Sequence, residues 1–205
     1  QSPDFERSIE VAVRALTFVT DHSSIDAVPT VKNGNQKAHT IGLGAMGLHT
    51  FFALNQMEYG SPESIEVTDL YFRLLNFYTL KASHKIAKEC GVTFDGFEKS
   101  AYASGTYFDA YTESDVEIKS EKVKEIFANL PIPTAEDWKQ LKADVMTDGL
   151  YHQNRLAIAP TGSISYVNET SASLHPITRL IEERQEKKTG KTYYPAPFLS
   201  NETLP

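Results

Sequence analysis

The sequence contains a single cysteine, Cys90, and no clustered metal ligands. One thiol excludes both an intramolecular disulfide framework and a cysteine-rich zinc site. The six histidines include no pair spaced i, i+4 and no histidine–glutamate motif with ligand spacing, so no metal site is expected. Cys90 precedes Gly91 at the end of a helical pattern, which favours a structural position near a helix C-terminus.

Positive charge and long apolar runs are also scarce. The chain has 20 Lys and Arg against 27 Asp and Glu, which gives a net charge of −7. This balance disfavours nucleic acid or an anionic membrane as the main partner. No segment approaches the roughly 20 apolar residues that span a bilayer, and neither end resembles a signal peptide. We therefore expect a cytoplasmic protein.

What is present suits a globular protein with a core. The chain has 205 residues, of which 40% are hydrophobic and 23% charged. This length matches one domain of ordinary size. No internal repeat or convincing linker divides residues 1–205, so no domain boundary is predicted.

The apolar periodicity predicts a mainly helical chain. A first helix is expected from an N-cap at Ser2-Pro3 to near Asp21, followed by a loop from Pro29 to Gln36. A second helix is expected from about His39 to Met57, and a third from near Thr68 to Gly91. The apolar face of the first helix would comprise Phe5, Ile9, Ala12, Val13, Leu16 and Val19.

The second half of the chain has shorter predicted elements. Residues 94–111 suggest helical turns and loops, and 120–130 a short helix. Thr134 with Asp137 forms a capping-box pattern for a helix that Gly149 ends. A strand is predicted at 155–159, and a strand or hairpin at 177–194, turning at Thr189-Gly190.

The most informative segment is Ala159-Pro160-Thr161-Gly162-Ser163-Ile164-Ser165-Tyr166. A strand that stops at a proline and continues through glycine and small hydroxyl residues leaves backbone N–H groups without partners. At a helix N-terminus such groups bind anions, and hydroxyls add donors. This indicates a cradle for a phosphate or diphosphate built without lysine. On spacing alone, an ordinary strand-to-helix turn with a Ser or Thr cap is favoured.

A competing motif is Gly42-Leu43-Gly44-Ala45-Met46-Gly47, which matches the G-x-G-x-x-G of dinucleotide-binding folds. That motif requires a buried strand just before it, but residues 35–40 form no such strand and only Ile41 is strongly apolar. We favour a glycine-bearing helix face that packs closely against a neighbour.

Long stretches around these motifs resemble a known family. HQNRLAIAPTGSISYVNETSASLHPI is similar to the substrate-diphosphate loop of the large (alpha) subunit of ribonucleotide reductase, most closely class Ib. TDHSSIDAVPTVKNGNQKAHTIGLGAMGLHTFFA, GFEKSAYASGTYFDAY and KTYYPAPFLSNETL resemble the same family in the same order. The resemblance covers nearly the whole chain, and it places Gly42–Gly47 in a helix.

The resemblance implies an α/β fold, with this segment forming part of a ten-stranded α/β barrel. It implies an enzyme that reduces ribonucleoside diphosphates to 2′-deoxyribonucleoside diphosphates by a thiyl-radical mechanism. The substrate diphosphate would be bound by Pro160, Thr161, Gly162, Ser163, Ile164 and Ser165. The reactive cysteines and a tyrosine relay would lie outside 1–205, so no catalytic residue is assigned and the isolated segment is expected to be inactive.

The resemblance also implies partners. These are a beta subunit carrying a metal–tyrosyl radical, a second alpha subunit, a glutaredoxin- or thioredoxin-like reductant, and ATP or dNTP effectors. No cofactor is assigned to this segment. Tyr193-Tyr194 lies in a different context from the family's tyrosine pair, so aromatic packing is expected there. The charged alternation from Arg179 to Lys188 favours a solvated face.

Two other functional classes stay open. The chain is a stand-alone nucleotide-binding module if Gly42–Gly47 binds a dinucleotide. It is a non-catalytic helical interaction domain if neither a diphosphate nor a dinucleotide binds.

Overall fold

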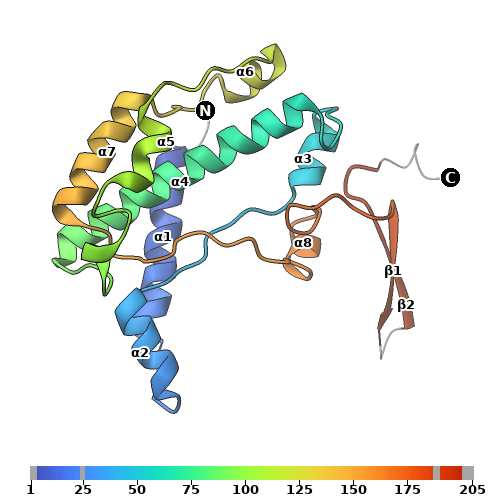
Figure 1. Ribbon diagram of the computed structural model, residues 1–205. Coiled ribbons are helices and arrows are strands. Elements are labelled where there is room, and N and C mark those ends of the chain that lie inside the picture. The colour runs from blue at the N-terminus through green and yellow to red at the C-terminus, as the bar shows by residue number, and fades with distance from the viewer. Residues whose placement is uncertain (1–3, 24–25, 187–189, 200–205) are drawn as a thin grey trace. The chain divides into compact units, whose positions relative to one another are not determined.

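The computed structural model describes residues 4–23, 26–186 and 190–199. The chain divides into two compact units. The first comprises Gln1–Leu43 and Glu66–Ala157, and the second comprises Gly44–Ile65 and Ile158–Pro205. Figure 1 labels the elements of both.

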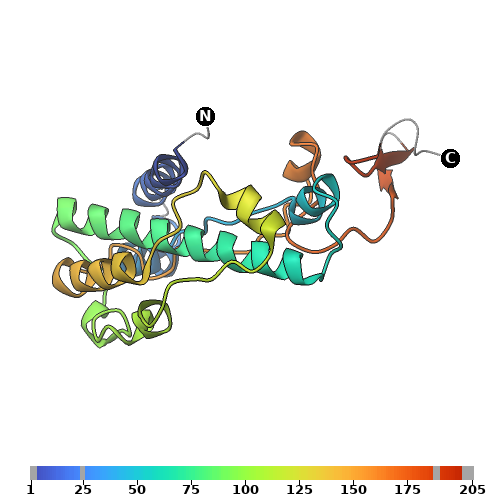
Figure 2. The ribbon, with the colours of Figure 1, turned by 90° about the horizontal axis from the view of Figure 1, so that it is seen from above.

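The core of the first unit lies around α4 (Pro62–Cys90), most of which belongs to this unit. Figure 2 shows α4 between α1 (Phe5–His22) and α7 (Ala135–Asp148). The Phe5 ring contacts the Tyr78 ring at 5.9 Å on one side, and Phe77 contacts Trp138 at 4.9 Å on the other. The central helix thus packs against both α1 and α7 through neighbouring aromatic side chains.

The first helix was predicted correctly apart from its cap and one face residue. The side chain of Asp4 accepts a hydrogen bond from the Arg7 N–H at 3.3 Å and caps α1. The predicted cap at Ser2-Pro3 lies outside the described residues. Ile9 and Val13 are buried as expected. Val19 is 61% exposed, which contradicts the prediction. The apolar side chains in the last turns of α1 face away from the core.

Helix α4 begins at Pro62, six residues earlier than predicted, and ends at Cys90. Pro62 suits the first helical position, where no N–H is needed. The Ser64 N–H donates to Ser61 Oγ at 3.3 Å, which supports the early start. Gly91 has φ +66° and its N–H donates to the Ala87 carbonyl, so it ends the helix as predicted.

The shorter elements also follow the predicted pattern. Residues 94–111 contain the turns η1 (Phe97–Lys99) and η2 (Thr106–Phe108) and the start of α5 (Asp109–Thr112). Helix α6 spans Glu121–Phe127. Helix α7 carries the full capping box of Thr134 and Asp137 and ends before Gly149. Its buried residues are Trp138, Leu141 and Val145.

Two predictions between residues 29 and 57 are wrong. Residues 29–38 form helix α2 (Pro29–Ala38) instead of a loop, since Pro29 occupies an initial helical position. Residues 39–47 are not helical, and only α3 (Leu48–Leu54) forms from the expected second helix. His39 and Gly47, both with positive φ, end α2 and begin α3.

The predicted strand at 155–159 is reduced to one parallel bridge, Leu156 to Leu43. The Leu43 N–H donates to the Arg155 carbonyl at 2.8 Å, and the Ala157 N–H donates to the Leu43 carbonyl at 3.0 Å. A strand needs a partner along its length. Among the described residues, only this short neighbouring segment supplies one.

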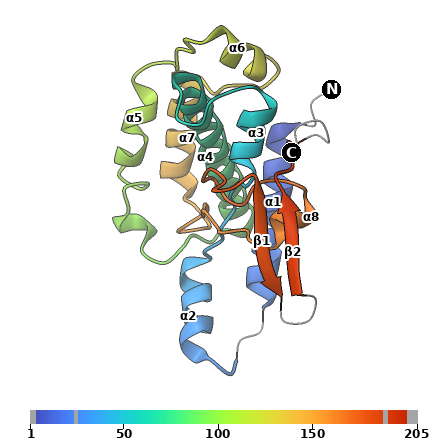
Figure 3. The ribbon, with the colours of Figure 1, turned by 90° about the vertical axis from the view of Figure 1, so that its right-hand side faces the viewer.

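The second unit contains α3, α8 (Ile164–Val167) and a hairpin of β1 (Ile181–Glu186) and β2 (Gly190–Pro195). The strands pair antiparallel, from Ile181 opposite Pro195 to Glu186 opposite Gly190 (Figure 3). The predicted hairpin is confirmed. Gly190 has φ +78°, and Thr189 lies outside the described residues.

The fold-class prediction is confirmed in its coarser part. The described residues are mainly helical, and their sheet has two strands, so they form no closed barrel. None of the described helices has the length and apolar character of a membrane span. The absence of an internal domain boundary stays a prediction.

Candidate functional site

The candidate site is the loop that precedes α8. Thr161 has φ +49°, a left-handed conformation that is uncommon outside glycine. Its carbonyl accepts a hydrogen bond from the Ser165 N–H at 3.1 Å, and the Ser163 carbonyl accepts one from the Tyr166 N–H at 3.3 Å. The chain therefore turns tightly into α8.

Three successive N–H groups of this loop are unpaired. Among the described residues, Gly162, Ser163 and Ile164 donate no backbone hydrogen bond, and no side chain caps α8. A Cβ atom on Gly162 would meet nothing within 4 Å, so the space above it is open. Adjacent N–H donors at an open turn are an arrangement that accepts an anion.

Thr161 is held in its unusual conformation from outside the loop. Its Oγ1 accepts a hydrogen bond from the Ser173 N–H at 2.7 Å. Ser173 itself is buried and has φ +50°. Because Oγ1 accepts from Ser173, the Thr161 hydroxyl hydrogen remains available for another acceptor.

The segment around Ser173 is fixed in turn by α3. The Thr50 N–H donates to Ser171 Oγ at 3.1 Å, and the Ser171 N–H donates to Thr50 Oγ1 at 2.8 Å. Further along, the Ile177 N–H donates to His49 Nδ1 at 2.7 Å, and burial lowers the pKa of His49, which favours its neutral accepting form. The loop thus rests on a hydrogen-bonded scaffold within one unit.

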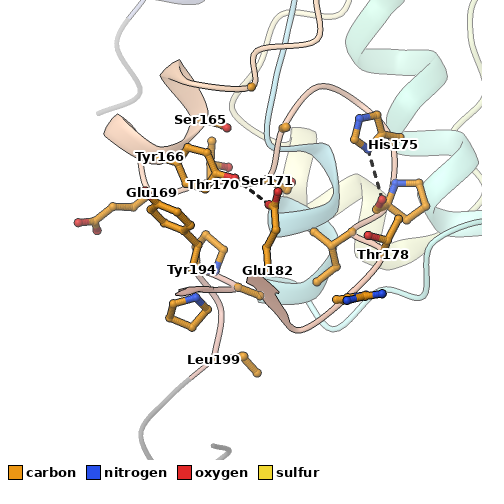
Figure 4. A pocket seen from close by; sticks show the side chains of 18 of the residues that line it. Ser165, Tyr166, Glu169, Thr170, Ser171, His175, Thr178, Glu182, Tyr194 and Leu199 are labelled. Carbon is orange, nitrogen blue, oxygen red and sulfur yellow. Dashed lines mark hydrogen bonds between the residues drawn. The ribbon is translucent and has the colours of Figure 1, made fainter. Parts of the chain in front are cut away.

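A cavity of about 660 Å³ lies beside the loop. Its charged lining comprises the cation Arg179 and the carboxylates Glu169 and Glu182. Figure 4 shows Tyr166 and Glu182 pointing toward one another, with the Tyr166 hydroxyl donating to the Glu182 carboxylate at 2.7 Å. The backbone donors of the loop, together with Arg179, are therefore the groups here that favour an anion.

The hairpin is joined to α8 by aromatic packing. The rings of Tyr166 and Tyr194 lie 4.3 Å apart, whereas Tyr193 is 59% exposed. The prediction of aromatic packing for this pair is confirmed for Tyr194. Sequence reasoning missed Glu182, because an alternating charged run gives no sign that one carboxylate reaches a tyrosine 16 residues away.

The six predicted site residues occupy different positions around the loop. Pro160, Gly162 and Ser165 line the cavity, and Ser165 is buried. Ser163 is exposed and Ile164 is 49% exposed. Ser173 was missed, because only the folded chain brings it to Thr161.

The glycine motif has a different structure from the one predicted. Gly42 and Gly44 lie outside any helix, so the prediction that these glycines are helical is wrong. The predicted close packing does occur, since a Cβ on Gly42 would lie 2.9 Å from the Ala157 Cβ. At the start of α3, Thr170 lies against Gly47 and Ser171 takes the Thr50 N–H. The chain itself occupies the position that a pyrophosphate would need.

The other chemical candidates give no site. Cys90 is a free, exposed cysteine at the end of α4, which agrees with its predicted position. Within the described ranges, no three His, Cys, Asp or Glu residues gather closely enough to bind a metal ion.

Comparison with known proteins identifies the family. The model of the family "Ribonucleotide reductase, barrel domain" matches residues 1–203. The chain belongs to the ribonucleotide reductase family. This agrees with the resemblance carried by the 159–166 loop and its flanking segments, and it assigns the chain to the barrel domain of that family.

Similar curated proteins are ribonucleotide reductase subunits. The chain is 46% identical over 196 residues to the ribonucleoside-diphosphate reductase subunit alpha of Bacillus subtilis (strain 168), covering 96% of this chain. It is 38% identical over 208 residues to the subunit alpha of Mycoplasma pneumoniae, covering 99% of this chain. The large subunit of equine herpesvirus 4 is 30% identical over 177 residues, or 85% of this chain.

The chain spans only part of these relatives. It covers 28% of the Bacillus subtilis subunit, 29% of the Mycoplasma pneumoniae subunit and 20% of the herpesvirus subunit. The matched part is therefore a fragment of the relatives' length, within the barrel domain. Most of each relative has no counterpart in the 205 residues.

Proposed function

We propose that this chain is the part of a ribonucleoside-diphosphate reductase alpha subunit that positions the substrate diphosphate. The intact subunit would reduce ribonucleoside diphosphates to 2′-deoxyribonucleoside diphosphates through a thiyl radical. The observation that supports this role is the turn at 160–165, in a chain of this family. It has no lysine, and three of its N–H groups have no hydrogen-bond partner among the described residues.

In this proposal the loop binds one end of the substrate. The N–H groups of Gly162, Ser163 and Ile164 donate to phosphate oxygens, and the hydroxyls of Thr161 and Ser163 add donors. Gly162 leaves room for the close approach of the phosphate. Pro160 and Ser165 complete the cradle at its two ends.

The chemical role of the loop is positioning. Fixing the diphosphate fixes the ribose relative to the reactive cysteine, which would lie outside these residues, and small misplacements of reacting atoms cost rate steeply. The support by Ser173 and α3 holds the donors in place before substrate arrives, which reduces the entropy lost on binding.

The partners belong to the same proposal. A separate beta subunit would supply the radical from a metal–tyrosyl site, and a glutaredoxin- or thioredoxin-like protein would supply electrons. ATP or dNTP effectors and a second alpha subunit would act elsewhere on the intact subunit. A dinucleotide at Gly42–Gly47 receives no support, because α3 begins against its own chain.

The test uses the intact subunit. Ser163→Ala removes one hydroxyl and keeps the backbone donors. A lost hydrogen bond to a charged phosphate costs about 1.5–3 kcal/mol, so KM for the diphosphate should rise about 10- to 150-fold. Steady-state kinetics with a ribonucleoside diphosphate measures this.

The matched control is Ser114→Ala, an exposed serine of the first unit outside the loop. It should leave KM and kcat unchanged. If Ser163→Ala also leaves both constants unchanged, Ser163 does not bind the substrate.

A further inference from the structure

Arg73, in the middle of α4, has a guanidinium group without a polar partner. Among the described residues it makes no hydrogen bond and no ion pair, and its Nε is buried. Its Cζ lies 5.0 Å from the centre of the Tyr111 ring. A cation removed from water usually has a counter-charge, because desolvation is costly.

Arg155 is a second cation without a counter-charge among the described residues, and it is more deeply buried than Arg73. It is only 4% exposed. Its Nη1 donates to the Tyr102 hydroxyl and its Nη2 to Asn76 Oδ1, both at 3.2 Å. Its buried Nε has no partner, and no carboxylate of the described ranges forms an ion pair with it. Both partners are neutral, so the charge itself is not compensated.

The hydrogen bonds around Asn76 leave an excess of donors. Its Oδ1 accepts from Arg155 and from the Tyr107 hydroxyl at 2.9 Å, and its Nδ2 donates to the Tyr111 hydroxyl at 3.3 Å. Burial raises the pKa of Tyr107 to about 12, so this hydroxyl stays protonated. Tyr111 and Tyr102 act as acceptors in these bonds, and each therefore keeps its own hydroxyl hydrogen for a further acceptor.

These groups adjoin a cavity of about 310 Å³ in the first unit, ample for an anion of a few heavy atoms. Asp69 also lines it, four residues before Arg73 on α4, but the two form no ion pair. Arg155 does not line the cavity but donates to Asn76, which does, so two arginines and one carboxylate belong to this cluster or its lining. The lining residues are Asp69, Phe72, Arg73, Asn76, Tyr107, Tyr111 and Leu156.

We propose that this arginine–tyrosine cluster (Arg73, Asn76, Tyr102, Tyr111 and Arg155) binds an oxyanion, either a carboxylate or a phosphoryl group. A planar guanidinium matches both groups with paired N–H donors. The oxyanion has two possible sources. It is a side-chain carboxylate from another part of the intact subunit, or it is a free anion. The proposal does not depend on the diphosphate loop or on catalytic activity.

The stability of the intact subunit distinguishes these sources. Arg73→Met keeps the aliphatic stem and removes the charge. If no oxyanion binds, removing an unpaired, partly buried cation leaves the melting temperature unchanged or raises it. If a carboxylate of the protein binds there, the variant leaves that carboxylate unpaired and the melting temperature falls by several degrees, even in phosphate-free buffer.

A free anion gives a different result. The melting temperature of the wild type then rises with inorganic phosphate at constant ionic strength and reaches a plateau, and the rise is lost in Arg73→Met. Tyr111→Phe, which removes only one hydroxyl, should weaken the same response. Arg7→Met, at an exposed arginine of α1, is the matched control and should behave like the wild type.

A structure of the intact subunit provides the direct observation. An oxygen of a carboxylate or phosphate within 4 Å of the Arg73 or Arg155 guanidinium is the expected result. The proposal is overturned if neither guanidinium has such an oxygen. It is also overturned if the wild type does not respond to phosphate while Arg73→Met is as stable as the wild type.

Discussion

His152 is a buried histidine whose hydrogen bonds fix its protonation. It is fully buried, with Nε2 2.9 Å from Thr17 Oγ1 and Nδ1 2.9 Å from Ser83 Oγ. The Thr17 hydroxyl donates to the Val13 carbonyl at 2.7 Å, so its oxygen must accept from His152. The ring therefore carries its hydrogen on Nε2 and accepts from Ser83 at Nδ1.

This arrangement predicts a pH-dependent stability. Burial and the nearby Arg155 lower the pKa of His152 from 6.5 to about 4. Between these values the unfolded chain binds the proton and the folded chain does not. The stabilisation is therefore complete above pH 6.5 and is lost as the pH falls toward 4, by about 3 kcal/mol at most.

The measurement is the melting temperature of the intact subunit between pH 7 and 4.5. Carboxylates with a lowered pKa, such as Asp148, lose their contribution mainly below their ordinary pKa of 3.8, outside this range, and the comparison between proteins isolates the histidine. His152→Gln should flatten the pH dependence, whereas His22→Gln, at an exposed histidine of α1, should not. Equal slopes for the wild type and His152→Gln would refute the assignment.

Among the secondary-structure elements, α7 shows how strongly local chemistry sets a helix boundary. Thr134 Oγ1 accepts from the Asp137 N–H at 3.2 Å, and the Thr134 N–H donates to the Asp137 carboxylate at 2.8 Å. The Thr134 N–H and the Thr134 hydroxyl, which donates to the same carboxylate at 2.7 Å, lower the pKa of Asp137. All the groups lie within four residues, so the sequence alone predicts the start of the helix.

Loss of this cap should loosen the first turn of α7. Thr134→Ala is expected to cost about 1 kcal/mol locally, which speeds hydrogen exchange of the first-turn amides about five-fold in the intact subunit. Thr147→Ala is the control on the same helix, because its hydroxyl donates only to the Ala143 carbonyl. Exchange that is unchanged in Thr134→Ala would show that tertiary packing alone holds the turn.

At the scale of the whole molecule, the chain leaves apolar surface uncovered. Ile158 is 67% exposed, Val167 77% and Leu54 68%. The backbone of 154–157 pairs on one side with 41–43, and the described residues give it no further strand. Exposed apolar side chains and unpaired strand edges favour association with other chains.

We therefore expect the isolated 205-residue chain to self-associate. Size-exclusion chromatography with light scattering should give a mass above 22.9 kDa that rises with concentration. The intact subunit is the control, because we expect the rest of its barrel domain to cover these surfaces. A concentration-independent monomer that unfolds cooperatively would show that the segment is stable alone.

The sequence by itself determined the features that depend on neighbouring residues. The capping box of α7, the end of α4 at Gly91 and the hairpin turn follow from side chains within a few positions of each other. The turn at 160–165 was also found from its local pattern, and its role in substrate binding stays a proposal.

The tertiary structure decided what depends on residues far apart in the chain. The Thr161 loop is held by Ser173, and Ser173's segment is held by α3, 121 residues away at the Thr50–Ser171 contact. The prediction of a strand at 155–159 was wrong because a strand forms only where a neighbouring strand, from another part of the chain, pairs with it along its length. Only folding shows whether a charge finds its counter-charge, and among the described residues Arg73 and Arg155 have no carboxylate partner.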